Sequence, residues 1–299
     1  METAQRARRL PSYKLQKRTL SLVIHIIMIA IALLMLLPFW LVIAASFTDN
    51  SALVLDGYRI WPSKFSLSAY TYLFLSPTSM LQAYGVTLFV TVFGTLFGLM
   101  MMAMLGYGLS RVQGKTRRFL SLLVLFPILF SGGLIPFYLV MTQIYHIKNS
   151  LLSLIFPYLV SPFWVLLLRS YFNQLPGEIL ESAKIDGANE LRIFFQIAIP
   201  LSLPALATIG LFTLLNYWND YWLAMLFITN KVLFPLQYLL FQLLSNAEIM
   251  NKSPQVTSIA VPGQSLRMAM AVVAAGPAIF VSLSLGRYFI KGITLGALK

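Results

Sequence analysis

The sequence contains no cysteine and only two histidines, His25 and His146, among its 299 residues. Without cysteine there can be no disulfide, no thiol nucleophile and no thiolate metal site. The two histidines are far apart and offer little for a metal centre. The sequence also lacks an HExxH motif, a GxSxG motif and paired carboxylates on one predicted helical face. These absences predict a chain that is not an enzyme and holds no metal.

Charged residues are scarce as well, since they make up 10% of the chain while hydrophobic residues make up 59%. A soluble domain is about a quarter charged, so this composition excludes the soluble class and predicts an all-α membrane protein. The net charge of +13 would suit nucleic acid, but the basic residues flank apolar runs, as topology signals do. We therefore expect membrane lipid and no nucleic acid as a partner.

Six apolar runs approach the length of about 20 residues that a transmembrane helix needs. They cover residues 20–46, 83–109, 119–142, 151–172, 201–229 and 266–288. The third and fourth are close together, so an alternative is that these two merge or split differently. The first run is too long for the core of a signal peptide, which is about 7–15 residues, and we expect it to be retained.

Glycine and proline predict where these helices pack or break. Gly94 and Gly98 are spaced to let two helix backbones approach closely. Pro127, Gly132, Gly133 and Pro136 predict that the third helix is kinked or interrupted. An interrupted helix is a feature of many translocation paths, and a plain structural kink is the alternative.

Lysine and arginine predict the orientation of the chain in its membrane. With the N-terminus inside, sixteen of the 22 basic residues lie on the inner side and six on the outer side. This bias places both termini in the cytoplasm. The predicted organisation is a tail (1–19), a first helix with an outer loop (20–82), a core domain (83–288) and a C-terminal tail (289–299). The other outer segments would be residues 143–150 and the long loop 230–265.

The segment "GLSRVQGKT", residues 108–116, looks like a phosphate-binding loop, but its spacing is wrong. That motif needs four residues between the first glycine and Gly-Lys, and this chain has five. No predicted strand precedes it. We therefore read it as a basic turn and expect no ATP site on this chain.

A polar and aromatic cluster lies in the fifth apolar run. Ionisable groups inside a bilayer usually face protein or a wet cavity, and aromatic rings can stack on sugar rings. The cluster is a candidate substrate path, and the alternative is an interhelical hydrogen bond beside an interfacial aromatic belt. A further alternative is an ion- or proton-coupled carrier that titrates Asp220. The candidate residues are Asn216, Tyr217, Trp218, Asn219, Asp220 and Trp222.

Between the fourth and fifth runs lies "ESAKIDGANELRIFFQIAIPLSLP", residues 181–204, in a loop that carries four of the nine acidic residues. Pro176 favours a helix start, and Glu178 and Glu181 suit the positive end of a helix. Gly187 can take the left-handed conformation that ends a helix. A helix of about ten residues is marginal alone in water, so we expect a cytoplasmic partner with a groove. A helix lying on the membrane surface is the alternative.

The spacing of Glu181, Ala183, Gly187, Ile197 and Pro200 resembles the EAA loop of permease subunits of binding-protein-dependent ABC importers. The chain departs from that pattern at Ser182 and Ile199. From about residue 80 to the end it is similar to the carbohydrate-uptake branch, in particular to oligosaccharide permeases of the lipo-oligosaccharide and alginate type.

The resemblance implies a pore in the bacterial cytoplasmic (inner) membrane, made by this chain and a second homologous permease subunit in a heterodimer. Two ATP-binding subunits would carry ATP and Mg, and no cofactor would bind this chain. An extracytoplasmic solute-binding protein would deliver an oligosaccharide, which alternating access moves inward. The loop of about residues 176–200 would couple the pore to the ATPases. The coupling residues that the resemblance implies are Glu178, Glu181, Ser182, Ala183, Asp186, Gly187, Ala188, Ile197 and Pro200.

Overall fold

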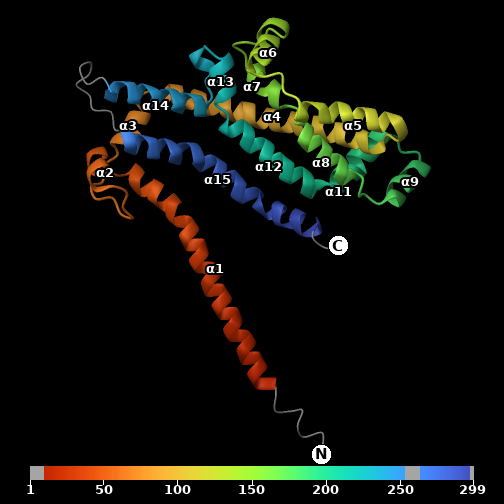
Figure 1. The fold of residues 1–299 in the computed structure, drawn as a ribbon, viewed down its shortest axis with the longest axis horizontal. Helices are drawn as coiled ribbons and strands as arrows, with labels where there is room; N and C mark the ends of the chain where they lie inside the picture. The colour runs from red at the N-terminus through yellow and green to blue at the C-terminus, as the bar shows by residue number, and fades with distance from the viewer. Residues whose placement is uncertain (1–9, 253–262, 297–299) are drawn as a thin grey trace, which may run out of the picture. The chain divides into compact units, whose positions relative to one another are not determined.

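The computed structural model describes residues 10–252 and 263–296, and all regular elements in these two ranges are helices (Figure 1). The all-α prediction is confirmed. The basic residues Arg6, Arg8, Arg9 and Lys299, which support the predicted orientation, lie outside the described residues. In chain order the helices are α1 (Leu10–Ser46), α2 (Asn50–Asp56), α3 (Ser68–Leu73), α4 (Pro77–Arg111), α5 (Gly114–Leu129), α6 (Leu134–Leu139), η1 (Val140–Ile144), α7 (Leu152–Ile155), η2 (Phe156–Tyr158), α8 (Pro162–Phe172), α9 (Gly177–Ile185), α10 (Glu190–Ile193), η3 (Phe194–Ala198), α11 (Ile199–Leu201), α12 (Leu203–Asn219), α13 (Trp222–Phe227), η4 (Lys231–Leu233), α14 (Leu236–Lys252) and α15 (Gly263–Gly296).

Three helices in the described ranges are long and apolar enough to cross a membrane by themselves: α1 from Leu20 onward, α4, and the part of α15 up to Ser282. Three further pairs of helices pass the same test together, but each pair is bent by more than 40° at a short break. Counting each bent pair once gives up to six spans, which agrees with the prediction of about six.

The third predicted span is interrupted at Gly132 and Gly133, whereas α5 continues through Pro127 to Leu129. α5 and the helical segment that starts at Leu134 are bent by 110° relative to each other. Gly133, the residue before α6, has φ 81°, in the left-handed region that glycine adopts without strain. The predicted limits were wrong at the start, because α5 already begins at Gly114 rather than near residue 119.

The prediction of one continuous helix over residues 201–229 was wrong. α12 ends at Asn219, and the backbone of Asp220 is extended, with φ −74° and ψ 122°. The Asp220 carboxylate accepts a hydrogen bond from the N–H of Leu223, 3.2 Å away, in the first turn of α13. Aspartate is favoured at helix starts for this reason, so Asp220 closes one helix and supports the next.

The outer segment 230–265, expected as a loop, contains the 17-residue helix α14. The N–H of Leu236 donates to Thr87 Oγ1 of α4 over 2.7 Å, which fixes the start of α14. Residues 253–262 of the predicted loop lie outside the described residues. In the first outer segment, α2 and α3 are helical, and α4 begins at Pro77 rather than at residue 83.

The chain divides into two compact units: Met1–Leu73 with Met250–Val272, and Phe74–Ile249 with Val273–Lys299. In the second unit α4 packs against α8 and α12. A Cβ placed on Gly94 would lie 2.5 Å from the Tyr217 ring, and one on Gly98 would lie 2.9 Å from the backbone oxygen of Leu159. The predicted close approach to another backbone is therefore found at Gly98, where the neighbour is the bend at Leu159, whereas Gly94 lies against a tyrosine ring and not against a helix backbone.

Candidate functional site

The loop between α8 and α12 contains the short helix α9, and Gly187 ends it as predicted. Gly187 has φ 80°. Its N–H donates to the carbonyl of Lys184 over 3.0 Å, and the N–H of Ala188 donates to the carbonyl of Ala183 over 2.9 Å. These two bonds form a Schellman motif, in which a left-handed residue satisfies the last carbonyls of a helix. The chain direction after α9 is thus fixed by backbone geometry.

One side of α9 is anchored and the rest is open. Leu180 is buried and packs with Phe172 in the cluster at this end of the second unit, and Ala183 packs partly against it. Glu178, Glu181, Ser182 and Asp186 are exposed. Ile185 is 86% exposed, which is unusual for so apolar a side chain. α9 therefore presents an acidic and partly apolar face that no residue of the described chain covers.

Glu190, at the start of α10, connects this loop to α4. One carboxylate oxygen lies 2.6 Å from Lys184 Nζ of α9. The other accepts a hydrogen bond of 2.7 Å from the Tyr107 hydroxyl and lies 3.7 Å from Arg111 Nε, both on α4. Sequence reasoning missed this role, because Tyr107 is 83 positions away in the chain. The one local signal is Asn189, whose side chain caps α10 and so orients Glu190.

The segment from α10 to α11 carries the loop back to α12. Ile193 and Phe194 are fully buried against α4 and α8, and Ile197 packs partly on the same cluster. Pro200 is exposed, and the segment meets α12 at a bend of 82°. Of the residues predicted to take part in coupling, Ala183, Ala188 and Ile197 thus contribute packing, whereas Glu178, Glu181, Ser182 and Asp186 form the open surface.

Four of the six residues of the predicted substrate path line one cavity of about 410 Å³. These are Asn216, Asn219, Asp220 and Trp222. The other lining residues, Phe212, Leu215 and Tyr221, add apolar and aromatic walls. Amide groups beside aromatic rings can bind a polar ligand that also has an apolar face.

The other two predicted residues, Tyr217 and Trp218, are buried and do not line this cavity. The Tyr217 hydroxyl donates to the carbonyl of Ile155 over 2.8 Å, and Trp218 Nε1 donates to the carbonyl of Ala274 over 3.0 Å. Both side chains therefore hold neighbouring segments of the second unit together.

Sequence reasoning also missed the partner of Asp220. The Tyr158 hydroxyl, from η2, donates to Asp220 Oδ1 over 2.9 Å, while Oδ2 accepts from Leu223. Both carboxylate oxygens thus make hydrogen bonds that shape the protein. Among residues 10–252 and 263–296, no group of three or more His, Asp or Glu side chains could hold a metal ion.

Comparison with known families identifies the class of protein. The model for "Binding-protein-dependent transport system inner membrane component" matches residues 94–295, which include the whole loop and the cavity. The chain belongs to this family. The resemblance carried by Glu181, Gly187 and Pro200 is thereby confirmed at the level of the family. The match also confirms the prediction of an integral inner membrane protein that works with a separate binding protein.

Individual relatives agree with that assignment. This chain is 38% identical to the polygalacturonan/rhamnogalacturonan transport system permease protein YtcP of Bacillus subtilis (strain 168), over 95% of this chain and 100% of the relative. It is also 38% identical to protein LplC of the same organism, over 88% of this chain and 89% of the relative.

A solved structure has the same fold. A chain from a bacterial ABC transporter involved in the import of the acidic polysaccharide alginate superimposes with a TM-score of 0.75 and 25% identity, over 92% of this chain and 98% of that one. The family and these relatives give no support to the alternative of an ion-coupled secondary carrier.

Proposed function

We propose that this chain is one of two pore-forming subunits of an ATP-driven importer and that α9 couples it to a separate ATPase. The observation that carries the proposal is α9 itself, a short helix that ends at Gly187 and pairs with Glu190 through Lys184, and whose acidic and apolar face is open. A short helix with an exposed apolar face is stabilised by a groove on a partner. In this arrangement both chain termini and α9 lie on the cytoplasmic side.

The complete transporter would contain a second, homologous permease subunit in a heterodimer, two ATP-binding subunits and an extracytoplasmic solute-binding protein. ATP and Mg would bind the ATP-binding subunits, and this chain would catalyse no hydrolysis and hold no cofactor. Residues 108–116 do not have the spacing of a phosphate-binding loop, which supports the proposal that ATP binds other subunits.

Movement of α9 would reach the spans by two routes. Glu190 links Lys184 of α9 to Tyr107 and Arg111 of α4. The buried residues Ile193 and Phe194 carry the same loop into the packing of α4 and α8. ATP binding can shift a pore from inward-open to outward-open only if the ATP-binding subunits interact differently with the two states of the pore. We expect that difference to act at α9.

The substrate class that the relatives support is an oligosaccharide, and among oligosaccharides one that carries acidic sugars. Two of the relatives are described as transporting polygalacturonan or rhamnogalacturonan and alginate. In the cavity near the end of α12, the amides of Asn216 and Asn219 could bond sugar hydroxyl or carboxylate groups, and Trp222 could stack on a ring.

The test is uptake by the reconstituted transporter, purified with its co-expressed partner subunits and binding protein. Oligogalacturonate uptake should depend on ATP, and Glu181→Lys should lower it at least about tenfold, because a charge reversal on an open docking face acts against the partner groove. The variant should remain in the membrane, since Glu181 is exposed. Normal uptake by Glu181→Lys, or uptake by the chain alone driven by a pH gradient, would overturn the proposal.

A further inference from the structure

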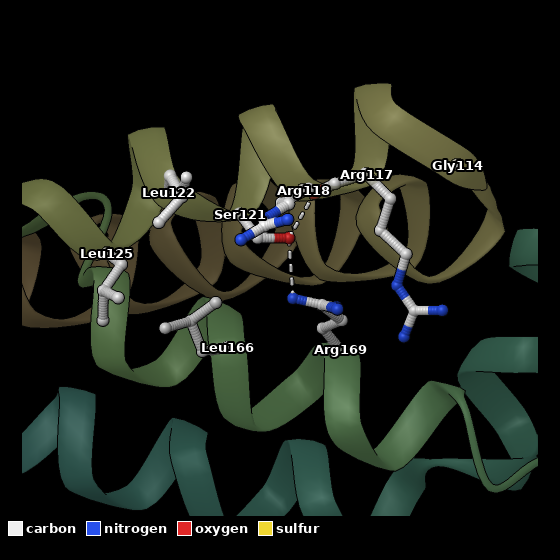
Figure 2. Close-up of a pocket in the computed structure, with 8 residues that line it drawn as sticks. All are labelled: Gly114, Arg117, Arg118, Ser121, Leu122, Leu125, Leu166 and Arg169. Atoms are coloured by element: carbon white, nitrogen blue, oxygen red, sulfur yellow. Dashed lines mark hydrogen bonds between the residues drawn. The ribbon is translucent and has the colours of Figure 1, made fainter.

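A second cavity, of about 390 Å³, lies between α5 and α8 near the turn that joins α4 to α5 (Figure 2). It is separate from the cavity at the end of α12, and the proposed function gives it no role. Its lining residues are Gly114, Arg117, Arg118, Ser121, Leu122, Leu125, Leu166 and Arg169.

Three of these residues are arginines, and no carboxylate lines the cavity. None of the ion pairs found within the described part of the chain involves Arg117, Arg118 or Arg169. Three like charges around one space repel each other, and a bound anion would relieve that repulsion. The composition of the cavity therefore points to a negatively charged ligand.

The arginine of α8 is held in place for such a ligand. Arg169 Nη1 donates a hydrogen bond of 2.8 Å to Ser121 Oγ, and Ser121 in turn donates to the backbone carbonyl of Arg117. Figure 2 shows this chain of bonds crossing from α8 to α5. A guanidinium has five N–H donors in a fixed fork, so Arg169 keeps donors that can meet phosphate oxygens.

The other end of the cavity is apolar. On α5 the leucines Leu122 and Leu125 follow the arginines, whereas on α8 Leu166 precedes Arg169 by one turn. Because the two helices run in opposite directions, the cationic ends coincide and so do the apolar ends, as Figure 2 shows. The cavity thus changes from cationic to apolar in the direction that leads away from the α4–α5 turn and along the spans.

We propose that this cavity binds an anionic phospholipid, with the phosphate of its headgroup at Arg117, Arg118 and Arg169 and the start of an acyl chain against the leucines. Basic pockets between transmembrane helices on the cytoplasmic side suit acidic headgroups, and the basic residues predict that this end is cytoplasmic. Free phosphate offers the same charge but gains nothing from the three leucines. The shared chemistry is a phosphate group, and the shape of the cavity favours the lipid as its source.

The experiment is a lipid titration of the purified full-length chain in detergent, followed by native mass spectrometry, with phosphatidylglycerol and phosphatidylcholine as probes. Phosphatidylglycerol should bind the wild type more tightly than phosphatidylcholine. Each lost arginine should weaken phosphatidylglycerol binding about fivefold, so Arg118→Gln should show about a fivefold loss and the pair Arg117→Gln with Arg118→Gln about 25-fold.

The matched control is Lys115→Gln, which removes the same charge from the first turn of α5 at a residue that does not line the cavity. It should change binding less than about twofold, because it leaves all three arginines in place. Equal binding of both lipids, unchanged binding by Arg118→Gln, or an equal loss in Lys115→Gln would overturn the proposal. So would complete displacement of the lipid by millimolar inorganic phosphate, which would identify a site for the free anion.

Discussion

Gly187 shows how one residue decides the geometry of the loop. Its φ of 80° is accessible to glycine but costs other residues about 1–2 kcal/mol. A Cβ at this position would meet no atom within 4 Å, so backbone conformation is the reason for glycine here. The sequence predicts this turn correctly because the requirement is local.

We therefore expect Gly187→Ala to lower ATP-driven uptake partly and Gly187→Pro to abolish it. Proline fixes φ near −65° and removes the N–H that bonds Lys184. The measurement is uptake per ATP hydrolysed in the reconstituted transporter. Gly177→Ala is the control, because Gly177 is in the same loop, has no left-handed φ, and a Cβ there would meet nothing within 4 Å. Wild-type coupling in Gly187→Pro would show that the turn is irrelevant to transport.

Asn219 and Trp218 are neighbours in the chain with different surroundings. Asn219 lines the cavity, whereas Trp218 is buried and bonded to the carbonyl of Ala274. Residue type alone could not predict which of the two lines the cavity, since both asparagine and tryptophan suit a sugar site.

Asn219→Ala should raise the KM for uptake several-fold and leave the thermal stability of the chain unchanged. Trp218→Phe should leave KM unchanged and lower stability by about 1–3 kcal/mol, because it removes the hydrogen bond to Ala274 and shrinks a buried ring. Uptake kinetics and thermal unfolding in detergent measure the two effects. The reverse pattern would place the substrate against Trp218 instead.

At the scale of the helices, the sequence predicted the interruption in the third span and missed those in the fourth span, which bends by 47° before Pro162, and in the fifth, at Asp220. The break before α6 is encoded locally, by Gly132, Gly133 and Pro136. The break at Asp220 depends on Tyr158, which is 62 positions away, so the apolar pattern of residues 201–229 continues through it. The contacts of Glu190 with α4 could not be predicted for the same reason, because its partners are distant in the chain.

Packing between helices gives a prediction about α4. A Cβ on Gly98 would lie 2.9 Å from the backbone oxygen of Leu159, which cannot move as a side chain can. Gly98→Ala should therefore destabilise the chain by about 1–3 kcal/mol. On the same helix, a Cβ on Gly85 would meet nothing within 4 Å, so Gly85→Ala should be neutral or slightly stabilising.

Thermal unfolding of the two variants in detergent, beside the wild type, measures this difference. If Gly98→Ala is as stable as Gly85→Ala, then α4 does not make the close contact that the structure places at Gly98.

At the scale of the whole molecule, composition and the basic residues were enough to predict a polytopic helical protein. The family could be predicted because the spacing from Glu181 to Pro200 combines a local turn with a fixed distance to the next span. The two compact units, and the helix α14 in the second outer segment, could not be predicted. They depend on contacts such as that between Leu236 and Thr87, which join distant parts of the chain.

The central claim is that α9 docks on a separate ATP-binding subunit. The chain has no cysteine, so a single cysteine introduced at the exposed Ser182 of α9 gives a unique site for cross-linking. In the co-purified transporter, Ser182→Cys should cross-link to the ATP-binding subunit, and the yield should change when ATP is added. Ser131→Cys, exposed in the break between α5 and α6, should give no such product. Absence of the Ser182→Cys product, or an equal yield from Ser131→Cys, would contradict the account.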